Sequence, residues 1–291
     1  MKDYAIRALG QIEASARKGI WGAHWGCAVI TGSLLVDEKL IDDEARTLVT
    51  GLLKSMVDSE PNSSKAGSED RVFIPRELFA EKLFAELAVG ATEPKELGHD
   101  VIYSAYVLKA LDHFGIMPWE SLLDGVTMLV RKIKAASPGW ITINGKKKFN
   151  KPGEAEEKTA DDYWTIFSRF DRSRSMEAGD MQLGHLLTHG HAIEMIRQGA
   201  GAELAADFDL AYRKRLRVLR LANEEQQEKI ALPLRELDPR TREYWTLAQS
   251  LEGMRDHALK YAYSFLDLRR DDLSATDLEA YGRILWLNEL K

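Results

Sequence analysis

Apolar and polar residues recur along this chain with the period of an amphipathic helix. In residues 3–18, Tyr4, Leu9 and Ile12 fall on one side and charged residues such as Arg7 and Glu13 on the other. The same pattern returns at about 44–57, 76–89, 119–136 and 203–221. This spacing predicts helices that pack one face against a core and expose the other.

A second kind of helix is expected between the amphipathic ones. Residues 21–36 carry no Asp, Glu, Lys or Arg before Asp37 and are rich in glycine, alanine and serine. Segments 94–114 and 180–198 also place histidines among apolar residues. Few positions in such segments suit solvent, so these helices should be buried on most sides.

The two kinds of helix alternate in units at 3–58, 75–136, 158–221 and 239–290. The last unit is read as one long helix from Pro239 to about Leu268, followed by a helix over 275–290. Stacking such units buries the small-residue helices inside and exposes the amphipathic ones. We therefore predict a single all-α domain over 1–291, made of stacked helical hairpins that form a solenoid or a closed α/α toroid.

One stretch is predicted to form strands. Two short β-prone runs flank Asn144-Gly145, so a small β-hairpin is expected at 141–149. A lone hairpin is marginally stable by itself, and we expect this one to lie as a flap on the helical body.

Composition narrows the class of protein. The net charge of −6 and the lack of a wide basic excess argue against a nucleic-acid partner. No apolar run is long enough to span a membrane, and the first residues lack the apolar core of a signal peptide. The single cysteine, Cys27, fits a reducing compartment. A cytoplasmic protein is expected, and self-association into a homo-oligomer stays open.

The histidines carry the candidate chemistry. Three of the seven lie in one stretch, at His185, His189 and His191. His185 and His189 are four residues apart and would share one helix face, as two ligands of one ion do, whereas His191 points elsewhere. His191 and His113 are interpreted as structural histidines with satisfied hydrogen bonds.

If the small-residue helices line an interior, their histidines converge. We predict metal ligation by His24, His99, His185, His189 and His257, because neutral imidazoles from separate helices suit iron or zinc. Asp256, Asp100 or Glu194 would orient a ligand. Tyr103, Asp100 and Tyr261 are the candidate catalytic residues, since they follow or neighbour the histidines at helical spacing.

The histidine-bearing stretch 183–196, with His24, His99 and His257 on separate helices, resembles the questin oxidase-like family. Members of that family are helical proteins that oxidise aromatic polyketides, and non-haem iron is implied for some of them. The resemblance implies oxidation of a small aromatic or polycyclic molecule and favours iron over zinc.

Three functions remain open at this point. The first is a metal-dependent oxidoreductase or oxygenase that acts on a small aromatic metabolite. The second is a hydrolase or lyase, either metal-free or similar to the HD phosphohydrolases that the His99-Asp100 pair resembles. The third is a helical protein that binds a small molecule without catalysis.

Overall fold

The computed structural model of the chain describes residues 1–59, 71–136, 140–143, 146–149, 154–170, 179–200, 202–224, 238–250 and 255–284. Within these ranges the chain is all-α apart from one two-stranded hairpin, as predicted. Its helices are α1 (Lys2–Ser15), α2 (Ala23–Asp37), α3 (Asp43–Ser59), α4 (Arg76–Ala88), α5 (His99–His113), α6 (Glu120–Ala135), α7 (Tyr163–Ser168), α8 (Gly179–Ala200), α9 (Ala202–Glu224), α10 (Arg242–Ser250), α11 (Arg255–Leu268) and α12 (Ala275–Ile284).

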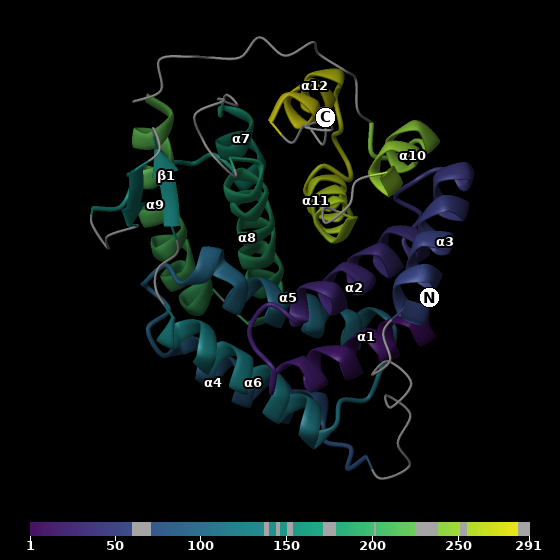
Figure 1. Cartoon of the computed structure of the whole chain (residues 1–291). Coiled ribbons are helices and arrows are strands. Elements are labelled where there is room, and N and C mark those ends of the chain that lie inside the picture. Colours follow the sequence, from purple (N-terminus) through teal and green to yellow (C-terminus); the bar gives the residue numbers. More distant parts are fainter. Residues whose placement is uncertain are drawn as a thin grey trace.

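Four helices form the interior. Helix α2 packs against α5 and α11, and α8 packs against the same two helices, so the four contacts close a ring. Figure 1 shows α2, α5, α8 and α11 in the middle of the molecule with other helices outside them. Each inner helix is the middle one of three consecutive helices. The ring therefore matches the toroidal alternative and the predicted alternation of buried and amphipathic helices.

Small residues let the inner helices approach their neighbours. A Cβ atom added to Gly26 of α2 would lie 2.5 Å from Ile12 Cγ1 and 2.9 Å from the Ala8 carbonyl oxygen of α1. A Cβ atom on Gly32 would lie 2.7 Å from Leu53 Cδ2 of α3. The absence of side chains at these positions explains why α2 reads as a run of small residues.

The hairpin is present where it was expected. Strands β1 (Trp140–Ile143) and β2 (Lys146–Phe149) pair antiparallel, with Trp140 opposite Phe149 and Ile143 opposite Lys146. The turn residues Asn144 and Gly145 and the predicted linker over 60–70 lie outside the described residues.

Two predicted helix boundaries are wrong. The helix expected over 94–114 begins only at His99, because Glu96, Leu97 and Gly98 have positive φ angles of 34°, 62° and 82° and form the 3₁₀ turn η2 (Glu96–Gly98). The single long helix expected from Pro239 is two helices, α10 and α11, which pack against each other. Among the described residues no helix combines the length and apolarity needed to cross a membrane.

Alanine substitution should affect stability in opposite directions at a tightly packed glycine, Gly26, and at an unpacked one, Gly51. Gly26→Ala should lower the free energy of unfolding by about 1–3 kcal/mol, because the added methyl group overlaps Ile12. Gly51→Ala is the control, since nothing lies within 4 Å of its added Cβ on α3. That change should raise stability by about 0.5–1 kcal/mol. Urea denaturation measures both, and a stabilising Gly26→Ala would contradict the packing.

Candidate metal centre

Four imidazoles, one from each inner helix, lie next to one another in a cluster. The ring centroids of His99 lie 4.6 Å from those of His24 and of His185. The His257 centroid lies 5.1 Å from that of His24 and 5.2 Å from that of His185. The ligand atoms of His24, His99 and His185 lie within 4.8 Å of one another, close enough to hold one ion. A second group with the same spacing joins His24 to Asp256 and His257.

Three of these histidines stand at helix starts. His99 is the first residue of α5, and His24 and His257 lie in the first turns of α2 and α11. The N-terminal ends of three helices therefore converge on the cluster. Their partial positive charges disfavour protonated imidazole and favour negative charge at the centre.

The outer nitrogens of three rings are held by acceptors. His24 Nδ1 lies 3.2 Å from Asp256 Oδ2, and His257 Nδ1 lies 3.0 Å from Asp256 Oδ1. His99 Nδ1 contacts the carbonyl oxygen of Glu96 in the positive-φ turn. A ring that donates its Nδ1 proton keeps a lone pair on Nε2, which is the tautomer that ligates metals in carboxylate–histidine pairs.

The inner nitrogens of His24 and His99 face each other. Their Nε2 atoms are 2.6 Å apart. If both carry lone pairs, they repel unless a cation lies between or beside them. Two imidazoles bound to one ion at about 2.0–2.1 Å hold their nitrogens about 3 Å apart, so the two rings would have to separate slightly to share an ion.

Lys260 permits a second arrangement of protons. Its Nζ lies 2.8 Å from His24 Nδ1 and 3.9 Å from Asp256 Oδ2. If Lys260 donates to His24 Nδ1, then His24 Nε2 carries the proton and donates to His99 Nε2. The two arrangements contain the same number of protons and differ only in which nitrogen of His24 carries one. Only the first leaves the Nε2 lone pairs of both His24 and His99 directed into the cluster.

The electrostatics of the cluster keep its histidines neutral. Burial, followed by the charge of Lys260, lowers the pKa of His24 to about 3. Burial and the neighbouring histidines lower the pKa of His99 and of His185 well below the usual range. Burial opposes ionisation of Asp256, but hydrogen bonds from His24 and His257 hold its pKa below the usual range. Neutral imidazoles are the form that binds metal.

Two buried polar atoms in the cluster have no hydrogen-bond partner among the described residues. They are the Tyr103 hydroxyl and His257 Nε2. The Tyr103 ring lies 5.1 Å from the His99 ring and 5.8 Å from the His24 ring. Because buried polar groups are almost always satisfied, two such atoms beside one histidine cluster point to a ligand.

The cluster approaches the surface on one side. The side chains of His24 and Asp256 are 12% and 24% exposed. Trp21 lies beside them, 54% exposed, with its ring 5.1 Å from the His99 ring and 5.5 Å from the His24 ring. An exposed indole therefore forms part of the rim.

The structure brings together four of the five predicted ligands. His189 lies one turn from His185 on α8, but its ring packs against Gly98 and lies 5.6 Å from the Tyr212 ring. Neither ring nitrogen of His189 has a partner among the described residues, and burial lowers its pKa to about 3. The pairing of His185 and His189 on one ion is therefore not found in this arrangement.

Two of the three predicted catalytic residues lie at the histidine cluster and one does not. Tyr103 and Tyr261 lie at the cluster, the latter with its ring 5.5 Å from the His257 ring. Asp100 is buried but belongs to neither group of ligand atoms. Burial raises the pKa of Asp100 to about 6, and the charge of Lys134 opposes that rise.

Lys260 was missed by the sequence reasoning. It lies in the run Ala258 to Leu266, where one lysine among apolar residues is the only signal. Asp256 was considered only as an alternative, yet it holds two of the four histidines. The carbonyl of Glu96, which holds a third, had no sequence signal.

His191 is a core histidine, as interpreted from the sequence. Its Nδ1 lies 3.1 Å from Ser264 Oγ and its Nε2 lies 2.9 Å from Asp267 Oδ2. This arrangement has the residue types of a hydrolase triad. Ser264 is fully buried, however, and its hydroxyl also contacts the Tyr106 hydroxyl at 2.8 Å, so it cannot reach a substrate.

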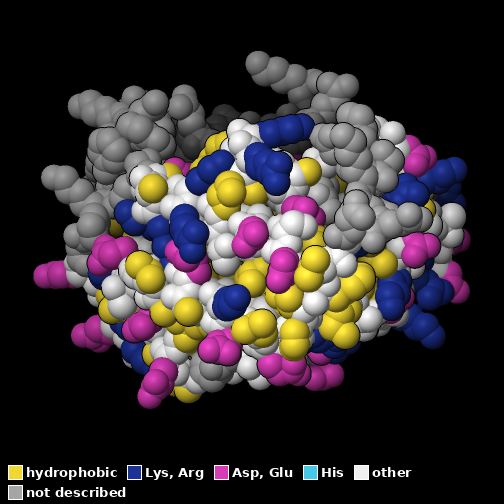
Figure 2. Space-filling view, turned by 90° about the horizontal axis from the view of Figure 1, so that it is seen from below, with side chains coloured by type: hydrophobic (Ala, Val, Ile, Leu, Met, Phe, Trp, Pro, Cys, Tyr) yellow, Lys and Arg dark blue, Asp and Glu magenta, His cyan; other side chains and the backbone are white. Residues whose placement is uncertain are grey.

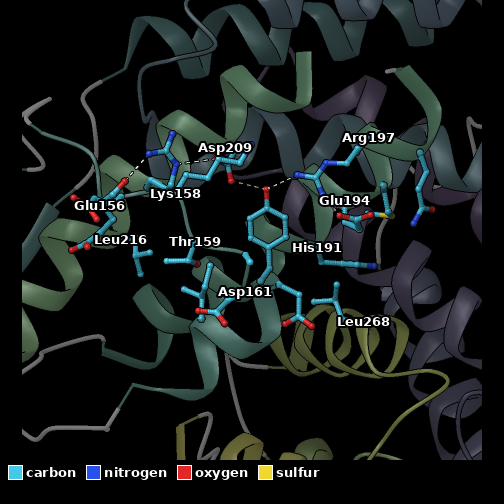
Figure 3. Close-up of a pocket in the computed structure, with 18 of the residues that line it drawn as sticks. Glu156, Lys158, Thr159, Asp161, His191, Glu194, Arg197, Asp209, Leu216 and Leu268 are labelled. Atoms are coloured by element: carbon cyan, nitrogen blue, oxygen red, sulfur yellow. Dashed lines mark hydrogen bonds and ion pairs between the residues drawn. The ribbon is translucent and has the colours of Figure 1, made fainter. Parts of the chain in front are cut away.

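A separate cavity of about 560 Å³ lies beside α7, α8 and α9. Figure 3 shows Arg197 and Asp209 hydrogen-bonded to a central tyrosine, which is Tyr163. Arg213 in turn donates to Asp209 Oδ2 at 2.9 Å and to the Glu156 carbonyl. The residues that line this cavity include none of the predicted metal ligands, and its arginines are engaged with neighbours.

Charge is mixed on the surface that Figure 2 shows. Acidic and basic side chains are interspersed there, without a broad area of one sign.

No family model matches the chain, and neither a curated protein nor a solved structure matches it.

The lowered pKa values predict acid sensitivity of the metal-free protein. His24 and His189 have a pKa of about 3 when folded and an ordinary value of 6.5 when unfolded, so the unfolded chain takes up protons first. Stability should fall as the pH drops from about 6.5 towards 3, with each histidine contributing up to about 1.4 kcal/mol per pH unit. Denaturant unfolding at pH 7 and 5 measures the loss. His189→Phe should reduce it, and an unchanged loss in this variant would contradict the shift.

Proposed function

We propose that this protein is a metal-dependent oxidoreductase that oxidises a small aromatic molecule at a divalent-metal centre held by His24, His99, His185 and His257. One observation carries the proposal. Four imidazoles from four helices lie in one cluster, and the Nδ1 atoms of three of them lie next to oxygen acceptors, from Asp256 and from the Glu96 carbonyl. Such preorganisation of the outer nitrogens is typical of metal ligands.

The donor set indicates what the ion would do. Imidazole suits iron, copper, nickel and zinc. Four neutral ligands leave the charge of a divalent ion uncompensated, so it would act as a strong Lewis acid with positions left for substrate or dioxygen. Iron is favoured over zinc because the resemblance to the questin oxidase-like family implies oxidation.

The rim supports an aromatic substrate. Trp21 exposes half of its surface while its ring contacts the rings of His24 and His99. An aromatic substrate stacked on this indole would lie next to the ion. The protein would then hold the substrate by packing and leave its reacting carbon close to the histidines.

A hydrolase or lyase at the same centre is the second candidate. Lys260 and Asp256 flank His24, which places a base and an acid beside the cluster without need of electron transfer. This candidate predicts zinc or another redox-inert ion in place of iron.

Metal and oxygen measurements separate the candidates. We expect protein purified without oxygen to contain about one ion per chain by elemental analysis. If the ion is iron and oxygen is consumed with hydroxylated aromatic compounds, the oxidoreductase is supported. Zinc without oxygen consumption would support the second candidate, and the absence of any stoichiometric metal would reject both.

Replacement of His185 tests whether this histidine is a ligand of the metal. His185→Gln should lower metal affinity by more than the roughly 10–100-fold that a change outside the ligand set costs. His189→Phe is the matched control, one turn away on α8, and should retain the metal. Equal losses in both variants, measured by competition with a chelator, would contradict the four-histidine assignment.

Asp256→Asn tests the outer hydrogen bonds. It keeps the shape of the side chain but loses the charge that holds His24 and His257, so metal affinity should fall about 10–100-fold while stoichiometry at high metal is retained. Asp267→Asn is the control, because Asp267 holds His191 outside the centre. An affinity unchanged in Asp256→Asn would remove the support for a metal-ligating tautomer.

A further inference from the structure

On the basis of the proposed function, we infer that the open position of the metal centre takes an anionic ligand and that the Tyr103 hydroxyl donates a hydrogen bond to it. The ligand is a small anion or the ionised oxygen of an organic substrate, and the shared chemistry is a negative atom that accepts a hydrogen bond.

The first support is the position of the Tyr103 hydroxyl. Tyr103 is 1% exposed, and its oxygen has no hydrogen-bond partner among the described residues. Its ring meets the His24 ring edge-on and lies against the His99 ring.

The second support is the charge balance of the cluster. Asp256 and Lys260 carry opposite charges 3.9 Å apart that cancel, and an imidazole that ligates a metal is neutral. A divalent ion would therefore bring two uncompensated positive charges into a buried site. An anionic ligand reduces that charge, and burying charge without compensation is costly.

The third support is the direction of the helices. The starts of α2, α5 and α11 meet at the cluster, so their unpaired N–H groups add positive potential there. A tyrosine hydroxyl can donate one hydrogen bond, and this buried one has no acceptor among the described residues, so it is available to an anionic ligand.

Tyr106 provides a matched control. It lies one turn further along α5, is equally buried, and its hydroxyl contacts Ser264 Oγ at 2.8 Å. In the metal-free protein, Tyr103→Phe removes an unpartnered hydroxyl and should leave the melting temperature unchanged or raise it. Tyr106→Phe loses a hydrogen bond and should lower the melting temperature.

The test is azide binding to full-length protein reconstituted with Co(II), followed in the visible spectrum. Metal content is measured first in every variant. Tyr103→Phe should retain its metal and bind azide about tenfold to a hundredfold more weakly than wild type, because a hydrogen bond to an anion is lost. Tyr106→Phe should bind azide as wild type does. Competition with 4-nitrophenolate shows which kind of anion the position takes. If 4-nitrophenolate displaces azide, the ligand is the ionised oxygen of an organic substrate. If it does not displace azide, the ligand is a small anion.

The outcomes separate the two proposals. Loss of metal from wild type would reject the metal centre and, with it, this inference. Metal retained with azide affinity equal in wild type and Tyr103→Phe would overturn only the role of Tyr103. Equal weakening in Tyr103→Phe and Tyr106→Phe would also overturn it, because a general disturbance of α5 would then explain the loss.

Discussion

The cost of burying four imidazoles in one place dominates the interior of this protein. Each ring brings two polar nitrogens out of water, and such atoms are costly unless they are paired. The Nδ1 atoms, which face away from the centre of the cluster, lie next to acceptors provided by Asp256 and the Glu96 carbonyl. At the inner nitrogens of His24 and His99 the rings meet each other at 2.6 Å, where either a shared proton or a shared cation is required.

The fold follows from the need to bring these rings together. One histidine comes from each inner helix, and α11 approaches α2 and α8 closely because Gly32 and Gly184 leave room for Leu259 and Tyr261. The positive-φ turn at Glu96–Gly98 ends just before His99 and presents the carbonyl that holds it. Backbone conformations of this kind persist only where the surrounding structure holds them in place.

Helical periodicity was sufficient to predict most of the architecture. The alternation of small-residue and amphipathic helices predicted which helices lie inside, and Asn144-Gly145 predicted the hairpin. The spacing of His185 and His189 placed both on one face of a helix but did not specify which neighbours that face meets. His189 lies against Gly98, so it is separated from the cluster that His185 joins.

Tertiary contacts explain why the sequence wrongly placed Asp100 at the cluster and gave no sign of Lys260 there. Asp100 follows His99 directly, yet successive residues on a helix point in different directions, and its buried carboxyl is in neither group of ligand atoms. Lys260 lies among apolar residues in the sequence, which does not predict its partner. It is 2% exposed and reaches His24 from another helix, which no local pattern reports.

X-ray absorption at the metal edge of the purified protein tests the central claim most directly. A centre held by His24, His99, His185 and His257 predicts about four nitrogen neighbours at about 2.0–2.1 Å, together with the outer-shell scattering that imidazole rings produce. Replacement of His99 by Gln should remove one imidazole from that signal. A metal without imidazole scattering, or a spectrum unchanged in the His99 variant, would contradict the four-histidine centre.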